Sequence, residues 1–241
     1  MDHSTRLHYL EAMGIDVWVR RLPHEFEPGL DLSSPQANDT EEAVVPVDQI
    51  PETPDGLNIW QVLQNEVAVC RQCDLCESRM QTVFGSGNPA ADWMIIGEAP
   101  GQSEDQQGLP FVGVAGQLLT EMLRAIGLSR EDVFITNILK CRPPNNRDPH
   151  KDEVAACHPY LARQIEAIKP KIILAVGRIA AQNLLNSDKT IGQLRGQVHD
   201  LNGIPLVVVY HPAYLLRSLL EKRKAWQDLQ LAMATYQAIE G

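Results

Sequence analysis

The chain of 241 residues is long enough for one good-sized hydrophobic core, or for one domain with an appendage. Its net charge of -10 falls on residues 1–66, which hold 13 acidic and 3 basic side chains, so residues 67–241 are neutral on balance. This distribution leaves room for a local basic face that contacts nucleic acid. No apolar run reaches the length of a membrane span and the N-terminus lacks a signal-peptide pattern, so we expect a cytoplasmic protein without membrane contact.

The N-terminal quarter is predicted to lie outside the main domain. Residues 1–22 form a small apolar island in which Leu7, Leu10 and Met13 share a helical face. Residues 23–56 are rich in proline, serine and acidic residues, and this composition buries too little apolar surface to fold by itself. We expect an acidic, extended linker there. The island is expected to dock on this protein's own core or on a sister subunit, with a separate protein partner as the alternative.

Residues 57–241 are predicted to form one globular domain. Helical apolar spacing is found at 58–70, 114–127, 150–168, 178–186 and 222–238. Short apolar runs typical of buried strands lie at 93–96, 133–136, 172–176 and 206–209. Apolar strands separated by helices favour a parallel sheet covered by helices on both faces. The predicted fold class is therefore α/β, with three α/β/α layers.

Each predicted strand is followed by a distinctive polar residue. These residues are Glu98, Asn137, Arg178 and His211. Because the carboxyl ends of parallel strands lie along one edge of a sheet, we expect the four side chains to converge there. The first strand also leads into a loop rich in glycine, proline and carboxylates, Gly97 to Asp105. This arrangement favours a ligand-binding loop; a plain strand–helix connection is the alternative.

The five cysteines favour a metal site. They are Cys70, Cys73, Cys76, Cys141 and Cys157, and an odd number without a secretion signal argues against structural disulfides. Cys70 and Cys73 have the two-residue gap that lets both sulfurs reach one metal. Cys141 and Cys157 can complete a four-thiolate site, which leaves Cys76 spare. Spacing alone is about equally compatible with zinc and with an iron–sulfur cluster, although the wide second pair tilts slightly toward iron–sulfur; buried free thiols are the third alternative.

Five motifs occur in one order along residues 57–239. They are Cys-x-x-Cys-x-Leu-x-x-x-Arg at 70–79, Val-Phe-Gly-Ser-Gly-Asn-Pro at 83–89, GEAPGQSED at 97–105, Asn-Ile-Leu-Lys-Cys-Arg-Pro-Pro at 137–144 and His-Pro-Ala-Tyr-Leu-Leu-Arg at 211–217. Together they resemble the iron–sulfur uracil-DNA glycosylases, family 4 of that superfamily. The resemblance implies a four-stranded parallel sheet between helices and favours iron–sulfur over zinc. It implies a [4Fe-4S] cluster on Cys70, Cys73, Cys141 and Cys157.

The resemblance also implies an activity. Such an enzyme hydrolyses the N-glycosidic bond of a uracil flipped out of DNA and leaves an abasic site in base excision repair. Phe111 then stacks on the base, and the amide of Asn137 accepts the N3–H of uracil and donates to O4, a pattern that cytosine reverses. His211 donates to O2 as negative charge builds on the uracil, which a neutral imidazole can do. The remaining substrate-binding residues are Gly97, Ala99, Pro100 and Glu104.

The loop departs from the better-known uracil glycosylases, whose corresponding motif is Gly-Gln-Asp-Pro-Tyr-His. Laid on residues 97–102, their water-activating aspartate falls at Ala99 and their methyl-excluding tyrosine at Gly101. Either Glu98 then orients the water as a catalytic residue, or main-chain groups do so and leaving-group stabilisation carries most of the barrier. By analogy Glu104 lies near the C5 edge of the base, where it helps to reject thymine, whereas Asp105 is expected to be structural.

Uracil-containing DNA is the expected partner. Phosphates need cationic side chains, and basic residues follow the second and the last strand. They are Lys140, Arg142, Arg147 and Lys151 in the first group and Arg217, Lys222, Arg223 and Lys224 in the second. An ordinary solvated surface is the alternative for both groups. Leu215 and Leu216 resemble the apolar tip that fills the space left by the flipped base.

Two other functions are compatible with these patterns. One is a non-catalytic DNA-binding partner of the replication machinery that retains the fold, with residues 1–22 as a tether. The other is a redox protein, which needs an exposed cluster and an electron partner. A cross-linking relative traps the sugar on a histidine in a basic loop inserted before the fourth cysteine. Residues 141–157 show no such insertion, so a monofunctional hydrolase is expected.

Overall fold

The structure is a computed structural model that describes residues 59–240. The apolar island predicted at 1–22 and the linker predicted at 23–56 lie outside the described residues, so both stay predictions. Within residues 59–240, no helix is long and apolar enough to cross a membrane.

A sheet of six strands, in the order β1-β3-β2-β4-β6-β5, forms the centre of the domain. The strands are β1 (Ser86–Gly87), β2 (Trp93–Gly97), β3 (Val133–Asn137), β4 (Ile172–Val176), β5 (Val198–Leu201) and β6 (Ile204–Val209). β3, β2, β4 and β6 pair in parallel and are the four strands predicted from the sequence. β1 and β5 add antiparallel pairs at the two edges, so the four-stranded prediction is right for the centre and incomplete at the edges.

The two edge strands lack the apolar run that identifies the central ones. β1 has only two residues, and β5 alternates between exposed and half-buried positions. β5 and β6 are joined by Asn202 and Gly203, whose φ angles are 54° and 89°. Two successive positive φ angles are typical of the tight turns that join antiparallel strands, and Asn-Gly is their strongest sequence signal. The Asn-Gly dipeptide was therefore the sequence signal from which a strand before β6 could have been predicted.

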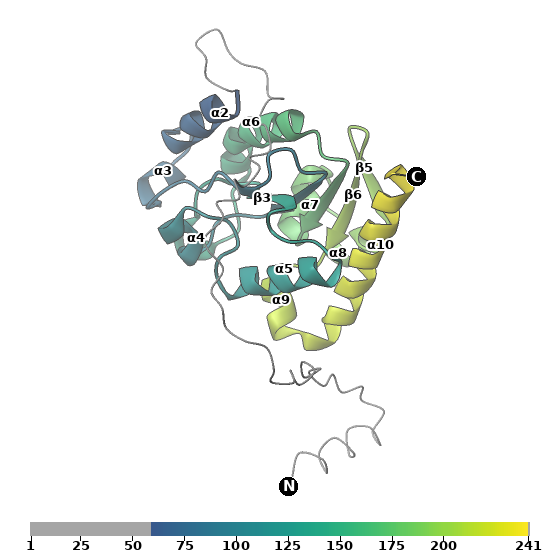
Figure 1. The fold of residues 1–241 in the computed structure, drawn as a ribbon. Helices are drawn as coiled ribbons and strands as arrows, with labels where there is room; N and C mark the ends of the chain where they lie inside the picture. The colour runs from purple at the N-terminus through teal and green to yellow at the C-terminus, as the bar shows by residue number, and fades with distance from the viewer. Residues whose placement is uncertain (1–58, 241) are drawn as a thin grey trace, which may run out of the picture. The chain divides into compact units, whose positions relative to one another are not determined.

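Helices connect the strands and cover the sheet (Figure 1). The α-helices are α2 (Ile59–Ala68), α3 (Leu75–Ser78), α4 (Gln102–Gln107), α5 (Val114–Ala125), α6 (Lys151–Ile168), α7 (Arg178–Leu184), α8 (Ile191–Leu194), α9 (Pro212–Arg217) and α10 (Lys222–Glu240). The 3-10 helices are η1 (Pro144–Asn146) and η2 (Leu219–Glu221).

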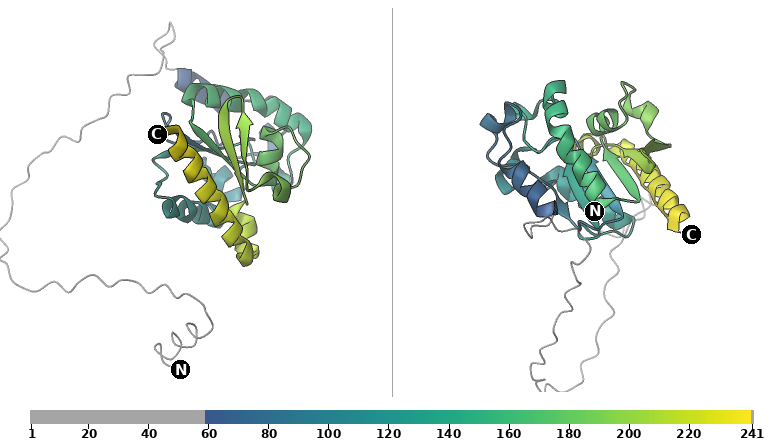
Figure 2. Two further views of the ribbon diagram at one scale, coloured as in Figure 1. Left: turned by 90° about the vertical axis from the view of Figure 1, so that its right-hand side faces the viewer. Right: turned by 90° about the horizontal axis from the view of Figure 1, so that it is seen from above.

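Successive residues of the central strands serve two separate hydrophobic layers. Ile95 packs with side chains of α5, α9 and α10, whereas its neighbour Ile96 packs with side chains of α2, α6, α7 and α8. Val207 and Val208 on β6 divide in the same way. Side chains alternate across a strand, so a strand buried on both faces must be apolar throughout. The three α/β/α layers predicted from the sequence are therefore present, as the views in Figure 2 show.

The order of the strands locates a natural ligand site. After β2 the chain adds β3 on one side of it and then β4 on the other, so the direction of the connections reverses at β2. In open α/β sheets the crevice outside the carboxyl ends of the strands at such a point is where ligands bind. The loop that begins at Glu98 leaves β2 at this point.

The described core predicts that the domain folds without the N-terminal quarter. Both hydrophobic layers are assembled by residues between Leu63 and Ala232, with Trp60 packed against one layer and Met233 and Tyr236 against the other. We expect a chain of residues 57–241 to unfold cooperatively at the temperature at which the full chain unfolds, as measured by circular dichroism. Loss of a cooperative transition in the shortened chain, beside an intact one in the full chain, would contradict this prediction.

Candidate active site

A cavity of about 810 Å³ opens at the carboxyl ends of the parallel strands. The polar residues that follow the four strands, Glu98, Asn137, Arg178 and His211, all line it. This convergence follows from the parallel sheet, which aligns the ends of its strands at one edge. The volume is within the range of cavities that enclose a small organic ligand.

Most other residues that the sequence placed in the site also line this cavity. They are Ala99, Pro100, Glu104, Phe111, Arg147 and Arg217. Gly97 lies behind the wall, against two of the lining side chains. The residues that do not belong to the lining are Arg142, Leu215 and Leu216.

Gly97 allows two walls of the cavity to meet. A Cβ atom at this position would lie 2.4 Å from Oδ1 of Asn137 and 2.5 Å from Cζ of Phe111. Neither distance is possible for a real side chain, so any other residue would push one of the two walls away. The parallel pairing of Gly97 with Asn137 fixes this arrangement, because the two residues are partners in the β2–β3 register.

Asn137 carries an unused hydrogen-bond acceptor into the cavity. The residue is 1% exposed, and its buried Oδ1 atom has no hydrogen-bond partner within residues 59–240. A buried acceptor without a partner is costly, and such atoms in native proteins usually await a ligand, a water molecule or an ion. Asn137 is therefore set to accept a hydrogen bond from a molecule that enters the cavity.

Lys140 supports Asn137 from behind and does not face DNA. Its side chain is fully buried, and its Nζ donates to Thr136 Oγ1 at 2.6 Å, to Gln164 Oε1 at 2.6 Å and to the carbonyl oxygen of Asn137 at 2.8 Å. Burial lowers the pKa of Lys140 to about 7, against the opposing effect of Cys157. The sequence-based prediction of a phosphate contact at Lys140 is thus wrong, since β3 leads this residue back into the core.

Phe111 lies in a strained backbone conformation at the cavity wall. Its φ angle is 53°, in the left-handed region, which a bulky residue adopts only when its surroundings hold it there, at a cost of about 1–3 kcal/mol. The ring centroid lies 5.8 Å from that of His211, with 31° between the two planes. Backbone strain of this kind clusters at functional sites, and here it orients an aromatic face beside Asn137 and His211.

His211 is neutral, and its hydrogen bonds define its tautomer. Its Nδ1 accepts the backbone N–H of Ala213 at 3.1 Å, where His211 caps the start of α9. Nδ1 is therefore unprotonated, and the proton of the neutral ring is on Nε2. Burial, followed by the charge of Arg217, lowers the pKa of His211 to about 4, against the opposing effect of Glu104. An uncharged N–H donor is thus available at the cavity near pH 7.

Glu104 organises the loops around the cavity. Its Oε1 accepts the backbone N–H groups of Val112 and Gly113, both at 2.9 Å, and its Oε2 accepts that of Gly101 at 3.1 Å. One carboxylate thus joins the start of α4 to the turn that carries Phe111. Asp105 is buried beside it and accepts the backbone N–H of Met80 at 2.9 Å, in keeping with the structural role expected for it.

Glu98 has an environment that favours its neutral form. Burial and the charge of Asp148 raise the pKa of Glu98 to about 7, and Arg178 partly opposes them. Arg178 also forms an ion pair of 2.7 Å with Asp148, so the loop after β3 and the start of α7 meet at the cavity. Asp148 was not among the predicted site residues. Its position in the Arg-Asp-Pro segment, just after the motif at 137–144, was the sequence signal that could have identified it.

The apolar tip predicted at 215–216 is wrong for Leu215 and stays a prediction for Leu216. Leu215 is 1% exposed and belongs to the core beneath the sheet, because positions 212 and 215 of α9 share its inner face. Leu216 points outward and is 39% exposed. Leu219 and Leu220 in η2 are more exposed, at 64% and 92%, and neither was predicted to belong to an apolar tip. The lack of helical periodicity after α9 was the available signal that these two side chains are not packed.

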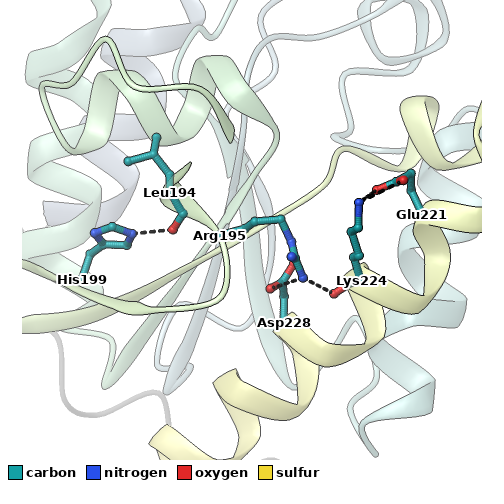
Figure 3. A network of polar contacts seen from close by, with 6 residues as sticks. All are labelled: Leu194, Arg195, His199, Glu221, Lys224 and Asp228. Carbon is teal, nitrogen blue, oxygen red and sulfur yellow. Dashed lines mark hydrogen bonds and ion pairs between the residues drawn. The ribbon is translucent and has the colours of Figure 1, made fainter. Parts of the chain in front are cut away.

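A network of charged residues joins the end of α8 to α10 (Figure 3). Arg195 forms two hydrogen bonds of 2.9 Å with the buried carboxylate of Asp228, and donates to the backbone oxygen of Lys224 at 2.8 Å. The Arg195 guanidinium also lies 5.6 Å from the centroid of the Tyr210 ring, and Tyr210 packs against Tyr214 at 5.1 Å. α8 and α10 are therefore tied together beside two aromatic walls of the cavity, neither of which was predicted.

Four of the cysteines line a second, smaller cavity next to β3. They are Cys70, Cys73, Cys141 and Cys157, and Cys76 is not in this lining. Arg79 donates to Cys141 Sγ at 2.8 Å, and the backbone N–H of Lys140 lies 3.3 Å from Cys157 Sγ. Burial raises the pKa of Cys141 to about 11. Among residues 59–240, no three His, Cys, Asp or Glu side chains converge closely enough to hold a single metal ion.

Comparison with known proteins identifies the family. Residues 84–230 match the uracil DNA glycosylase superfamily. The chain is 50% identical over 159 residues to a protein of Archaeoglobus fulgidus named type-4 uracil-DNA glycosylase, a match that covers 63% of this chain and 80% of that protein. Proteins of the same name from Saccharolobus solfataricus and Sulfurisphaera tokodaii are 51% and 45% identical, over 64% and 66% of this chain and 76% and 79% of theirs.

These matches confirm the family that the sequence motifs indicated. They span the cavity at the strand ends, since residues 84–230 contain the polar residues after all four parallel strands. The chain belongs to the type-4 branch of the uracil-DNA glycosylase superfamily.

Proposed function

We propose that this protein is a DNA-repair enzyme that hydrolyses the bond between uracil and deoxyribose in DNA and leaves an abasic site. The observation that carries the proposal is the unpartnered Oδ1 of Asn137, buried at the base of a cavity that Phe111 and His211 also line. A flipped base needs a cavity with an aromatic face and a polar group that reads its edge, and these three residues supply both. The names of the relatives support the same activity.

Asn137 reads the base. Its free Oδ1 accepts the N3–H of uracil, and the amide nitrogen donates to O4. Cytosine has an acceptor at N3 and a donor at C4, so both bonds would be lost and each mispaired buried group would cost about 1–3 kcal/mol. Phe111 offers its ring face to the base and holds it for the reaction.

His211 stabilises the leaving group. The bond from C1′ of the sugar to N1 of uracil breaks, and its electron pair moves onto the base, largely to O2. The neutral His211 ring has its proton on Nε2, so it donates a hydrogen bond to the oxygen on which charge develops. A neutral donor also avoids the desolvation cost of a buried cation.

Glu98 orients the attacking water. The water oxygen bonds to C1′ and its proton passes to the Glu98 carboxylate, so the immediate products are an abasic sugar and the uracil anion. The anion then takes a proton at N1 from solvent, and Glu98 releases its proton to solvent. A pKa of about 7 places Glu98 near the value at which a general base is most useful at neutral pH. This assignment accounts for Ala99, which has no group that could take the proton. Glu104, whose oxygens are bound to the loop, limits space near the C5 edge of the base.

Cys70, Cys73, Cys141 and Cys157 are proposed to hold a [4Fe-4S] cluster. The fit rests on the donor set, since four thiols line one buried cavity and two of them already accept hydrogen bonds from Arg79 and from the backbone of Lys140. Burial raises the pKa values of Cys141 and Cys157, and these residues would bind iron as thiolates, which coordination would stabilise against that burial. The cluster supplies a covalent staple between the segment after α2, the end of the β3 loop and α6. The excision reaction needs no electron from it.

The DNA strand is expected to lie across the cavity mouth. Arg217 and Arg147 line the cavity, and Arg142 donates to Asn146, another lining residue, while Leu216 supplies exposed apolar surface beside Arg217. Residues 1–22 are proposed to contact another protein or a second copy of this chain. The cytoplasmic location stays a prediction from the sequence.

Replacing Asn137 tests the proposed reading of uracil. We expect Asn137→Asp to lower the excision rate about 100-fold or more, because a carboxylate cannot donate to O4 and a buried polar group left unpaired costs up to about 3 kcal/mol, more if it is charged. The assay incubates each protein with a uracil-containing oligonucleotide and then with alkali, which cleaves abasic sites. Asn202→Asp, in the β5–β6 turn at the far end of β6, is the matched control. Wild-type rates in Asn137→Asp would remove Asn137 from the pocket; a wild-type protein with no activity would favour the non-catalytic alternative.

The pH dependence of excision tests Glu98. Because the carboxylate is the form that accepts a proton, we expect the wild-type rate to rise as the pH passes about 7. Glu98→Gln should be slower and should lose this rise. Lys140 has a pKa near 7 as well, so only the difference between the two profiles assigns the titration to Glu98. The exposed Glu166→Gln is the control, and an unchanged rise in Glu98→Gln would assign it to another group.

Cysteine variants test the cluster. We expect Cys141→Ser to lose most of the iron and acid-labile sulfide of the purified protein, together with its broad visible absorbance. Cys76→Ser should keep all three, because Cys76 does not line the cavity. Equal iron contents in the two variants would speak against this set of ligands.

A further inference from the structure

The turn that carries Phe111 is held from two sides. On its amide side the Glu104 carboxylate accepts the N–H groups of Val112 and Gly113, both at 2.9 Å. On its carbonyl side Arg130 donates from Nη2 to the oxygen of Pro110 at 2.7 Å and from Nη1 to the oxygen of Phe111 at 3.2 Å. A backbone with φ of 53° at a phenylalanine needs such restraint, because the unrestrained residue prefers negative φ.

Arg130 reaches the turn from outside the cavity. It lies in the connection between α5 and β3, and its Nη1 also donates to Thr120 Oγ1 on α5 at 3.4 Å. Within residues 59–240 the lining of the cavity does not include Arg130. Its guanidinium therefore has no direct access to a base bound there, and any effect on the base must pass through the turn at 110–111.

Within residues 59–240, Arg130 is the group that donates hydrogen bonds to the carbonyl oxygens of Pro110 and Phe111. Helix α5 packs so closely under the turn that a Cβ atom at Gly116 would lie 1.8 Å from the carbonyl oxygen of Phe111. That side of the turn thus has room for backbone only, and Thr120 Oγ1 donates to the Gly116 carbonyl and not to the turn. Without Arg130, the oxygens of Pro110 and Phe111 lose a shared charged donor, and buried carbonyls without partners favour a rearranged backbone.

We propose that Arg130 is a positioning residue for base capture. It holds the carbonyl groups of Pro110 and Phe111, so that the backbone of Phe111 stays in its left-handed conformation and the ring faces the flipped base. The inference rests on the proposed stacking role of Phe111. It predicts that removing Arg130 lowers the maximal excision rate, since fewer flipped bases are held productively. The KM for DNA should change little, because phosphate contacts dominate DNA affinity and Arg130 makes none of those assigned above.

A double-mutant cycle tests the proposal on the full-length protein loaded with its cluster. The variants are Arg130→Met, which keeps the length of the side chain and removes its donors, Phe111→Leu, and the two combined. We expect Arg130→Met to lower kcat about tenfold, within the range of one base–aromatic stack, and to leave KM unchanged. In the Phe111→Leu background, Arg130→Met should cost almost nothing further, because the ring that it positions is already absent.

Two further variants separate positioning from general stability. Arg130→Lys, which retains one charged donor, should recover part of the rate and gives a second reading if Arg130→Met folds poorly. Arg124→Met removes an exposed arginine on α5 that pairs only with Glu121, and it should match the wild type. Thermal unfolding of every variant shows how much of a rate change follows from stability.

The outcomes distinguish the inference from the function on which it rests. A wild-type kcat in Arg130→Met, beside a reduced one in Phe111→Leu, overturns the role of Arg130 alone. Equal losses from Arg130→Met in both backgrounds also overturn it, since additivity means that Arg130 does not act through Phe111. A wild-type rate in Phe111→Leu overturns the stacking role itself, and the inference with it.

Discussion

The close approach of β2 and β3 at their carboxyl ends is the constraint on which the site depends. Gly97 and Asn137 are partners in the parallel register, and only the absence of a side chain at Gly97 lets the Asn137 amide and the Phe111 ring lie side by side. A slip of one residue in this register would turn Asn137 to the other face of the sheet. The buried apolar strands prevent that slip, so the hydrophobic pattern that builds the fold also positions Asn137 in the wall of the cavity.

Residues 137–141 join the cavity at the strand ends to the cysteine cavity. Asn137 ends β3, and Lys140 and Cys141 follow it, with the Lys140 ammonium bound to the carbonyl oxygen of Asn137 and the Lys140 amide directed at Cys157 Sγ. A group that fixed Cys141 and Cys157 would therefore also restrain the backbone of Asn137. A metal site at these cysteines would therefore stabilise the position of Asn137 without taking part in electron transfer. This connection also gives a reason for the burial of Lys140, whose Nζ donates to three oxygen atoms of the surrounding residues.

Sequence patterns predicted what depends on continuous periodicity or on local motifs. The four apolar strands, the convergence of the residues after them and the grouping of four cysteines all follow from spacing along the chain. Leu215 and Lys140 were misplaced because both lie in short segments, where the direction of a side chain is set by contacts with the sheet and not by composition. Asp148 and Arg130 could not be assigned, since each acts through a partner, Arg178 or the Phe111 turn, that is distant in sequence. Residues 1–58 carry predictions that the described structure does not reach.

The electrostatic design of the cavity suits a neutral substrate that becomes charged only as it reacts. His211 is neutral, the Glu104 carboxylate is satisfied by three backbone N–H groups, and Arg178 is paired with Asp148. Burial and the charge of Asp148 raise the pKa of Glu98 to about 7, so this wall carboxyl group changes its charge near neutral pH. Uracil enters uncharged, and a fixed cation at its O2 edge would bind anionic ligands more tightly than the base itself. An oriented N–H at His211 instead gains strength only as the bond to the sugar breaks, which is when stabilisation accelerates the reaction. Under the proposed mechanism, Ala99 at the position of the aspartate is compatible with catalysis, because the barrier would be lowered chiefly on the side of the leaving group and Glu98 would need only to take one proton from water.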